Sequence, residues 1–111
     1  MTNAYKILGQ IIPAANTLTT LYTVPAARSA VVSSINICNQ STANNQDIRV
    51  AVIPSGATAN AYHYVAYGLP IPYSDSISLA LGVTLASNDY IQVYANNTTS
   101  ISFAAFGLEV Y

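Results

Sequence analysis

The chain has 111 residues, a formal net charge of −1 and seven charged side chains, 6% of its residues where an ordinary soluble domain carries about 25%. Three basic residues, at positions 6, 28 and 49, are too few and too scattered to follow a phosphate backbone, which argues against nucleic-acid binding. A single cysteine excludes an internal disulfide, and without a Cys/His cluster we expect no structural zinc site.

The first two predicted strands lie near the N-terminus. Residues 5–12 form the first, and a turn that begins at Pro13 ends it. The second covers residues 19–24, where Thr, Leu, Tyr and Val suit a half-buried pleated surface. Pro25 ends this strand because it has no N–H group to donate at the next position of a ladder.

The third predicted strand covers residues 30–39. Side chains alternate between the two faces of a strand, so the more apolar face carries Val31, Ser33, Ile35 and Ile37. Val32 and Cys38 lie on the other, mixed face. Within an apolar strand we expect Cys38 to be a buried thiol without a reactive role.

Five more strands are predicted in the second half of the chain. They cover residues 47–53, 61–67, 76–81, 90–95 and 100–111. In the first of these, Ile48, Val50 and Val52 are expected to face inward, with Arg49 and Ala51 facing outward.

Glycine, proline and loop residues between these strands set the expected strand ends. Gly68 and the Pro-Ile-Pro segment at 70–72 are expected to stop strand pairing after residue 67. Residues 82–88 are expected to form a loop. In the strand that follows, Ile91 and Val93 are expected to face inward.

Eight strand-like segments spaced about 8 to 14 residues apart, with Gly, Pro and Asn between them and no convincing helix, predict an all-β fold. The fold class we expect is an antiparallel β-sandwich of about eight strands, jelly-roll-like. At this length residues 1–111 form a single domain, with possible extended arms at 1–6 and 108–111.

Few residues could act as a catalytic acid, base, nucleophile or metal ligand, so we expect no enzymatic activity, no cofactor and no bound metal. His63 is the one histidine, and we expect it to be structural or solvent-facing. Asp47, Asp75 and Asp89 stand at strand starts, where an aspartate usually accepts backbone N–H groups in a turn. Two of them could converge on calcium, but no DxDxD spacing supports such a site.

Nine tyrosines are the feature most open to a functional interpretation. The candidates for a contact surface are Tyr62, Tyr64, Tyr67 and Tyr73, which lie close together in the sequence. Tyrosine rings stack on sugars and also anchor protein interfaces. A third alternative, that half of them fill the core, stays open.

The surface is expected to be neutral and able to form hydrogen bonds. Asn, Ser and Thr supply 31 residues and Ala another 17. Such a composition fits either a secreted β module or a subunit covered by neighbours, since low net charge favours association. The N-terminus has no signal-peptide pattern and no apolar run reaches the ~18 residues of a membrane span, so we expect synthesis in a cytoplasm and no membrane contact.

The order of the segments TLTTLYTVP, VVSSINICNQST, IRVAVIPSGA, YHYVAYGLPI and LALGVTLASNDYIQVYA resembles a group of small β-sandwich proteins encoded among the structural genes of tailed bacteriophages. The resemblance extends from about Thr17 to Phe106 and consists of strand and turn patterns. It includes no catalytic motif, so no functional residue is carried over.

The resemblance implies a non-enzymatic virion structural protein, first of all a capsid cement or decoration protein that stabilises the shell. The alternative is a neck, tail or fibre component with a receptor- or glycan-binding role. The implied partners are the major capsid protein or other virion proteins and further copies of the chain, with a trimer favoured. The implied location is the virion, after synthesis in the host cytoplasm.

Overall fold

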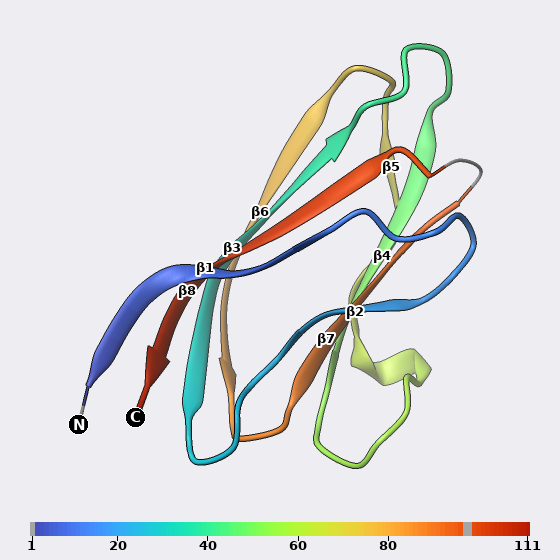
Figure 1. Ribbon diagram of the computed structural model, residues 1–111. Coiled ribbons are helices and arrows are strands. Elements are labelled where there is room, and N and C mark those ends of the chain that lie inside the picture. Colours follow the sequence, from blue (N-terminus) through green and yellow to red (C-terminus); the bar gives the residue numbers. More distant parts are fainter. Residues whose placement is uncertain (1, 97–98) are drawn as a thin grey trace.

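The computed structural model describes residues 2–96 and 99–111, whose strands form two four-stranded antiparallel sheets (Figure 1). One sheet has the strand order β1-β8-β3-β6 and the other β2-β7-β4-β5. The strands are β1 (Asn3–Ile11), β2 (Thr19–Thr23), β3 (Ser29–Asn39), β4 (Gln46–Ile53), β5 (Tyr64–Ile71), β6 (Ser76–Leu85), β7 (Tyr90–Ala95) and β8 (Ile101–Val110). The predicted all-β sandwich is confirmed.

The connectivity is that of a jelly roll. Strands pair as β1 with β8, β2 with β7, β3 with β6 and β4 with β5, so the chain behaves as one long hairpin whose tip is the β4–β5 connection. Rolling this hairpin places successive pairs in different sheets, and the pairings of β3 with β8 and β4 with β7 complete each sheet.

The core lies between the two sheets and is built by alternation. Inward side chains are fully buried in both sheets, among them Ile35, Ile37, Phe103, Ile48, Val50, Ile91 and Val93. Val52 is partly buried and packs against the same cluster. The inward positions predicted for β4 and β7 are therefore confirmed.

A β-bulge in β3 overturns part of the predicted pattern. The register of β3 against β8 shifts between Val32 and Ser34, so one extra residue occupies this strand. Val32 is fully buried before the bulge and Ile35 after it, whereas Val31 is only partly buried. Placing Val31 on the same face as Ile35 was wrong, because strict alternation does not survive a bulge.

Three predicted boundaries also differ. Residues 61–63 form a short 3₁₀ turn, η1 (Ala61–His63), so the strand predicted from residue 61 begins at Tyr64. Pairing continues past Gly68, and Pro70 lies opposite Asp47. β5 is an edge strand, where the missing N–H group of a proline is tolerated. β6 extends to Leu85 instead of ending at residue 81.

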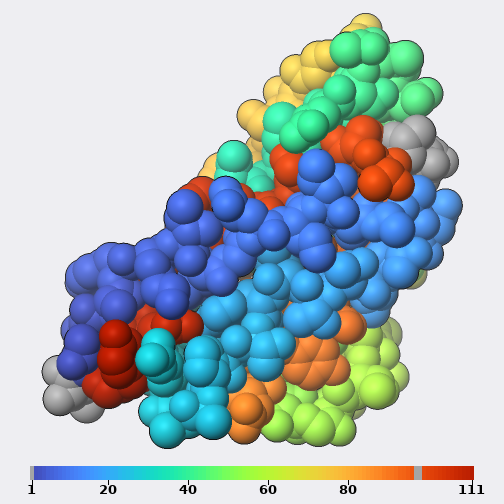
Figure 2. Space-filling model, viewed as in Figure 1, coloured from blue at the N-terminus to red at the C-terminus, as the bar shows by residue number. Residues whose placement is uncertain are grey.

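The two segments considered as possible arms pair with each other. Asn3 lies opposite Val110 and Lys6 opposite Gly107, and the backbones of Thr2 and Tyr111 exchange two hydrogen bonds of 2.5 and 2.9 Å. Figure 2 shows the N-terminal residues, in dark blue, lying along the C-terminal ones, in dark red. Residues 3–6 and 108–110 are thus part of the sheet, and Thr2 and Tyr111 continue the pairing just beyond the strand ends; residue 1 lies outside the described residues.

Two glycines mark places where backbones approach too closely for a side chain. A Cβ atom at Gly9 would fall on the carbonyl oxygen of Leu21 in β2, and one at Gly107 on the carbonyl oxygen of Val31 in β3. Gly9 lies in β1, an edge strand of its sheet, at a point where that strand packs against β2 of the other sheet. Gly107 lies opposite Val32, next to the bulge of β3.

We expect Gly9→Ala and Gly107→Ala each to lower the free energy of unfolding by about 2 kcal/mol, because the methyl group forces backbones apart. Urea denaturation followed by circular dichroism measures the change. The control is Gln10→Ala at a neighbouring exposed position, which should change the free energy by less than about 0.5 kcal/mol. Glycine variants as stable as this control would contradict the packing described.

Candidate functional site

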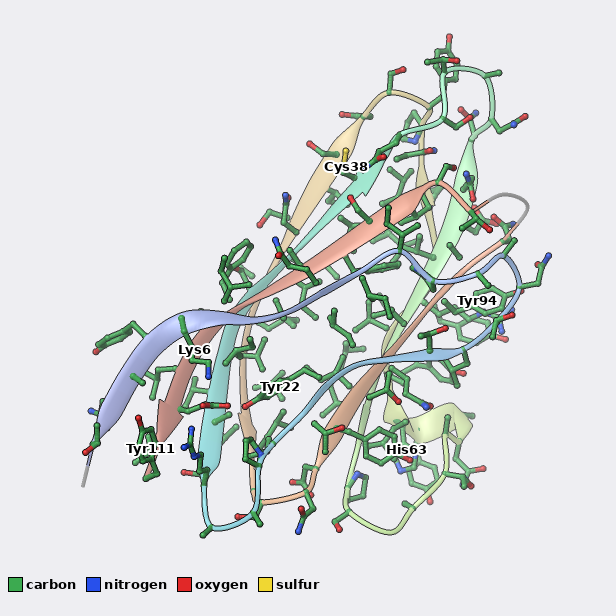
Figure 3. All side chains as sticks on the ribbon, in the orientation of Figure 1. Lys6, Tyr22, Cys38, His63, Tyr94 and Tyr111 are labelled. Atoms are coloured by element: carbon green, nitrogen blue, oxygen red, sulfur yellow. The ribbon has the colours of Figure 1, made fainter. Side chains whose placement is uncertain are left out.

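A buried carboxylate joins the ends of the chain. Glu109 in β8 is 1% exposed, and it accepts hydrogen bonds from Tyr22 (2.5 Å), Lys6 (3.0 Å) and Arg28 (2.9 Å). Tyr22 belongs to β2 in the other sheet, so its bond crosses the sandwich; Lys6, Tyr22 and Tyr111 lie near one another in Figure 3. The Arg28 guanidinium also lies 3.8 Å from the ring centroid of Tyr111.

These contacts define the ionisation of the cluster. The hydrogen bond from Tyr22 is the largest cause that lowers the pKa of Glu109, and with Lys6 and Arg28 it outweighs the opposing effect of burial. Burial, followed by the bond to Glu109, raises the pKa of Tyr22 well above its usual value. The carboxylate is ionised and hydrogen-bonded at neutral pH, which fits a structural role. We call Glu109 together with Tyr22, Lys6 and Arg28 the Glu109 clasp.

The outer face of the β1-β8-β3-β6 sheet is uncharged over the described residues. β3 and β6 contain no charged residue, and β1 and β8 contain one each, Lys6 and Glu109. These two are bonded to each other, and Glu109 points into the sandwich. By the register, Lys6 lies opposite Gly107 on the inner side of its sheet, where its side chain is 45% exposed at the edge of the sandwich, so the charges of these strands lie off the outer face.

Apolar side chains form two cross-strand rows on this outer face. The register aligns Tyr5, Leu108 and Val31 in one row, and Ile7 with Phe106 in the next. Tyr5 is 80% exposed and Ile7 52%, while the other three are partly exposed. We call these five residues the apolar patch.

A shallow pocket adjoins the apolar patch along β8. Its lining includes Gln10, Ile12, Asn36, Ser102, Ala104 and Phe106. Ser102 and Ala104 are small and lie between the longer side chains of the neighbouring strands, which leaves the surface hollow. The patch and the pocket together make this face uneven, neutral and partly apolar.

The tyrosines predicted as interface residues lie at two ends of the sandwich. Tyr64 and Tyr67 meet edge to face, with ring centroids 5.0 Å apart and planes at 84°. Tyr62 in η1 is 80% exposed, and its ring centroid lies 4.5 Å from that of His63. That these residues contact a partner stays a prediction.

Tyr73 lies apart from the other three. It belongs to the turn between β5 and β6, where its backbone N–H donates to the Asn45 side chain before β4. η1 follows the other end of β4 and contacts that strand. Strand β5 carries the chain along the sandwich between Tyr64 and Tyr73, so neighbours in sequence become distant in space.

Arg49 is held between two tyrosine rings on the outer face of the β2-β7-β4-β5 sheet. Its Cζ atom lies 4.2 Å from the ring centroid of Tyr67 and 4.4 Å from that of Tyr94. The three residues are direct cross-strand neighbours in β5, β4 and β7. Sequence reasoning placed Arg49 outward but missed this arrangement, because the rings come from strands far apart in the chain.

An open pocket of about 570 Å³ lies beside Tyr67. It is lined by Ala59, Asn60, Ala61, Tyr64 and Tyr67. The Asn60 backbone N–H donates a 3.0 Å hydrogen bond to Nδ1 of His63, which is buried, so this histidine shapes the loop that forms the pocket. The structural role expected for His63 is confirmed.

The aspartates largely act as the sequence predicted. Asp89 accepts backbone N–H groups of Ser55 and Ala86, and Asp75 accepts that of Ser76. Cys38 differs from the prediction, because it is partly exposed on the uncovered outer face of β3.

Within residues 2–96 and 99–111, no three His, Cys, Asp or Glu side chains form a group that could hold a metal ion. No helix in the described part of the chain has the length and apolar character needed to cross a membrane.

The topology defines the class of the fold as an eight-stranded jelly roll. No protein-family model matches the sequence, and no curated protein matches it. Among solved structures, it is similar to a chain in the structure of infectious bursal disease virus Gt strain, with a TM-score of 0.48 and 9% sequence identity. The match covers 96% of this chain and 31% of the viral chain.

We expect the melting temperature to fall as the pH drops below about 4.5, and Glu109→Gln to reduce this dependence. The folded-state pKa of Glu109 is lowered, so the unfolded chain takes up the proton first and stability is lost as the pH falls. At neutral pH the variant should lose about 2 kcal/mol of unfolding free energy, because hydrogen bonds to an ionised group are lost.

Calorimetry between pH 3 and pH 7 checks both effects. Asp47→Asn, which neutralises an exposed carboxylate, is the control and should keep the acid dependence of the wild type. If the melting temperature of Glu109→Gln depends on pH as that of the wild type does, the ionised Glu109 carboxylate does not contribute to stability as described.

Proposed function

We propose that this chain is a non-enzymatic structural subunit of a tailed-bacteriophage virion, bound to the capsid shell as a cement or decoration protein. It binds the major capsid protein, or another virion protein, and stabilises the shell by bridging its subunits. Copies associate with one another as a trimer. The chain folds in the host cytoplasm and becomes part of the particle.

The observation that carries this proposal is the uncharged outer face of the β1-β8-β3-β6 sheet with its apolar patch. Exposed apolar patches of this kind mark protein contacts. A face without charges can be covered by a partner without removing an ion from water, which is the expensive part of burying a polar surface. Within the apolar patch Tyr5 is the most exposed side chain, at 80%, so it would bury the most surface in such a contact.

The overall composition supports a subunit present in many copies. With 6% charged residues and a net charge of −1, neighbouring copies repel one another little. The resemblance of the strand segments to small virion proteins of tailed phages agrees with this role. Jelly rolls occur in viral capsid domains and in lectins alike, so the fold by itself does not choose between these functions.

Immunogold labelling of intact virions with antibody against the purified protein tests the location. We expect label spread over the head. Label confined to the neck, tail or fibre tips would overturn the cement role and favour the alternative of a component in one of those structures.

A charge placed in the apolar patch should prevent incorporation into the particle. We expect Ile7→Lys to lower the number of copies per particle, relative to the major capsid protein, by about tenfold or more, because binding would bury the ammonium group. Quantitative mass spectrometry of purified virions measures this ratio.

The matched control is Tyr62→Lys, which adds the same charge at an exposed residue outside the patch. It should be incorporated like the wild type, and both variants should keep the unfolding free energy within about 0.5 kcal/mol. Incorporation of Ile7→Lys at the wild-type level would contradict the proposed docking face.

A further inference from the structure

Arg49 differs from the other two cations in having no acidic partner within residues 2–96 and 99–111. Lys6 and Arg28 both bind Glu109, whereas Arg49 forms no ion pair or hydrogen bond with the described residues. Tyr67 and Tyr94 flank Arg49 from the two neighbouring strands, and its Cζ atom lies over both rings. The N–H groups around its edge therefore remain available, and their planar arrangement matches both oxygens of a carboxylate.

The strands hold this guanidinium in place before any ligand arrives. Tyr67 and Tyr94 flank Arg49 by the register of three strands, and Tyr64 packs edge-on against Tyr67. The hydroxyl of Tyr94 donates a 3.0 Å hydrogen bond to the Asn16 side chain. Binding a ligand would therefore cost little conformational entropy of these side chains, which favours affinity.

The open pocket shares Tyr67 with this cation: the Tyr67 ring lines the pocket and also lies 4.2 Å from Cζ of Arg49, which is not itself a lining residue. Its lining combines two tyrosine rings, two alanines and an asparagine. Rings offer a flat apolar surface, while the hydroxyl and amide groups can form hydrogen bonds to neighbouring polar atoms. A sugar ring has the matching properties, with apolar C–H faces and hydroxyl groups around its edge.

The charges around the pocket restrict the chemical class of ligand further. Asp47 lies two residues before Arg49 on the same face of β4, so the site has no excess of positive charge that would attract a polyanion. A neutral sugar offers hydroxyl oxygens to the guanidinium edge but no charged group with two acceptor oxygens. A single carboxylate on a sugar ring satisfies Arg49 by geometry, with little demand for long-range attraction.

We infer that the outer face of the β2-β7-β4-β5 sheet binds an acidic glycan, a sialic or uronic acid unit whose ring lies against Tyr64 and Tyr67 and whose carboxylate binds Arg49. This site lies on the opposite sheet from the apolar patch, so a subunit docked through the patch would present it outward. The inference does not depend on the location of the chain in a virion.

The test is a glycan array that carries sialylated and uronic-acid oligosaccharides beside their neutral counterparts, probed with the full chain. Isothermal titration of the strongest acidic oligosaccharide and its neutral counterpart follows. We expect the acidic form to bind at least about tenfold more tightly. Arg49→Lys, which keeps the charge but loses the two-point geometry, should weaken binding by about tenfold, and Tyr67→Ala should abolish it.

Two controls separate this site from the fold and from the docking face. Tyr73→Ala removes an exposed tyrosine at the other end of the sandwich, and Ile7→Lys alters the apolar patch; both should bind the acidic glycan like the wild type. An array without acidic hits would overturn the inference. So would an Arg49→Lys variant of unchanged affinity, or a Tyr73→Ala variant that loses binding as Tyr67→Ala does.

Discussion

The ionised carboxylate of Glu109, buried between the sheets, is the interaction on which the rest of the structure depends. Tyr22, Lys6 and Arg28 reach it from β2, from β1 and from the turn before β3, so one group in the last strand fixes the start of the chain and connects the two sheets. In a jelly roll the first and last strands pair with each other, and nothing later in the chain can hold them. Stabilising this pair therefore stabilises the whole rolled hairpin.

The Glu109 clasp also determines where the few charged side chains of the molecule lie. It uses two of the three cations and the one glutamate inside a single cluster, which leaves the outer face of one sheet neutral. It also leaves Arg49 as the cation available on the other sheet, between two tyrosines. The two outer faces thus differ in chemistry: one is suited to be covered by protein without the cost of burying ions, and the other presents a cation and aromatic rings.

Alternation and turn chemistry were sufficient to predict the eight strands and the inward residues of β4 and β7, because those residues follow one another without an extra residue on the core face. They failed at Ser33, where a bulge reverses the faces of β3, since a bulge is set by the partner strand and not by local residue preference. They failed again at Pro70, which is acceptable only because β5 turned out to be an edge strand. Neither the Glu109 clasp nor the Tyr67–Arg49–Tyr94 arrangement could be predicted, because both depend on which strands become neighbours.

The measurement that tests the account most directly is a cryo-electron-microscopy map of the virion at a resolution that places this chain. The account predicts density on the capsid shell, with the apolar patch around Tyr5 and Ile7 against a neighbouring protein and with Arg49 and Tyr67 facing solvent. A chain located on the shell but with the Arg49 face buried and Tyr5 exposed to solvent would contradict the assignment of the two faces. Density absent from the head would contradict the proposed role itself.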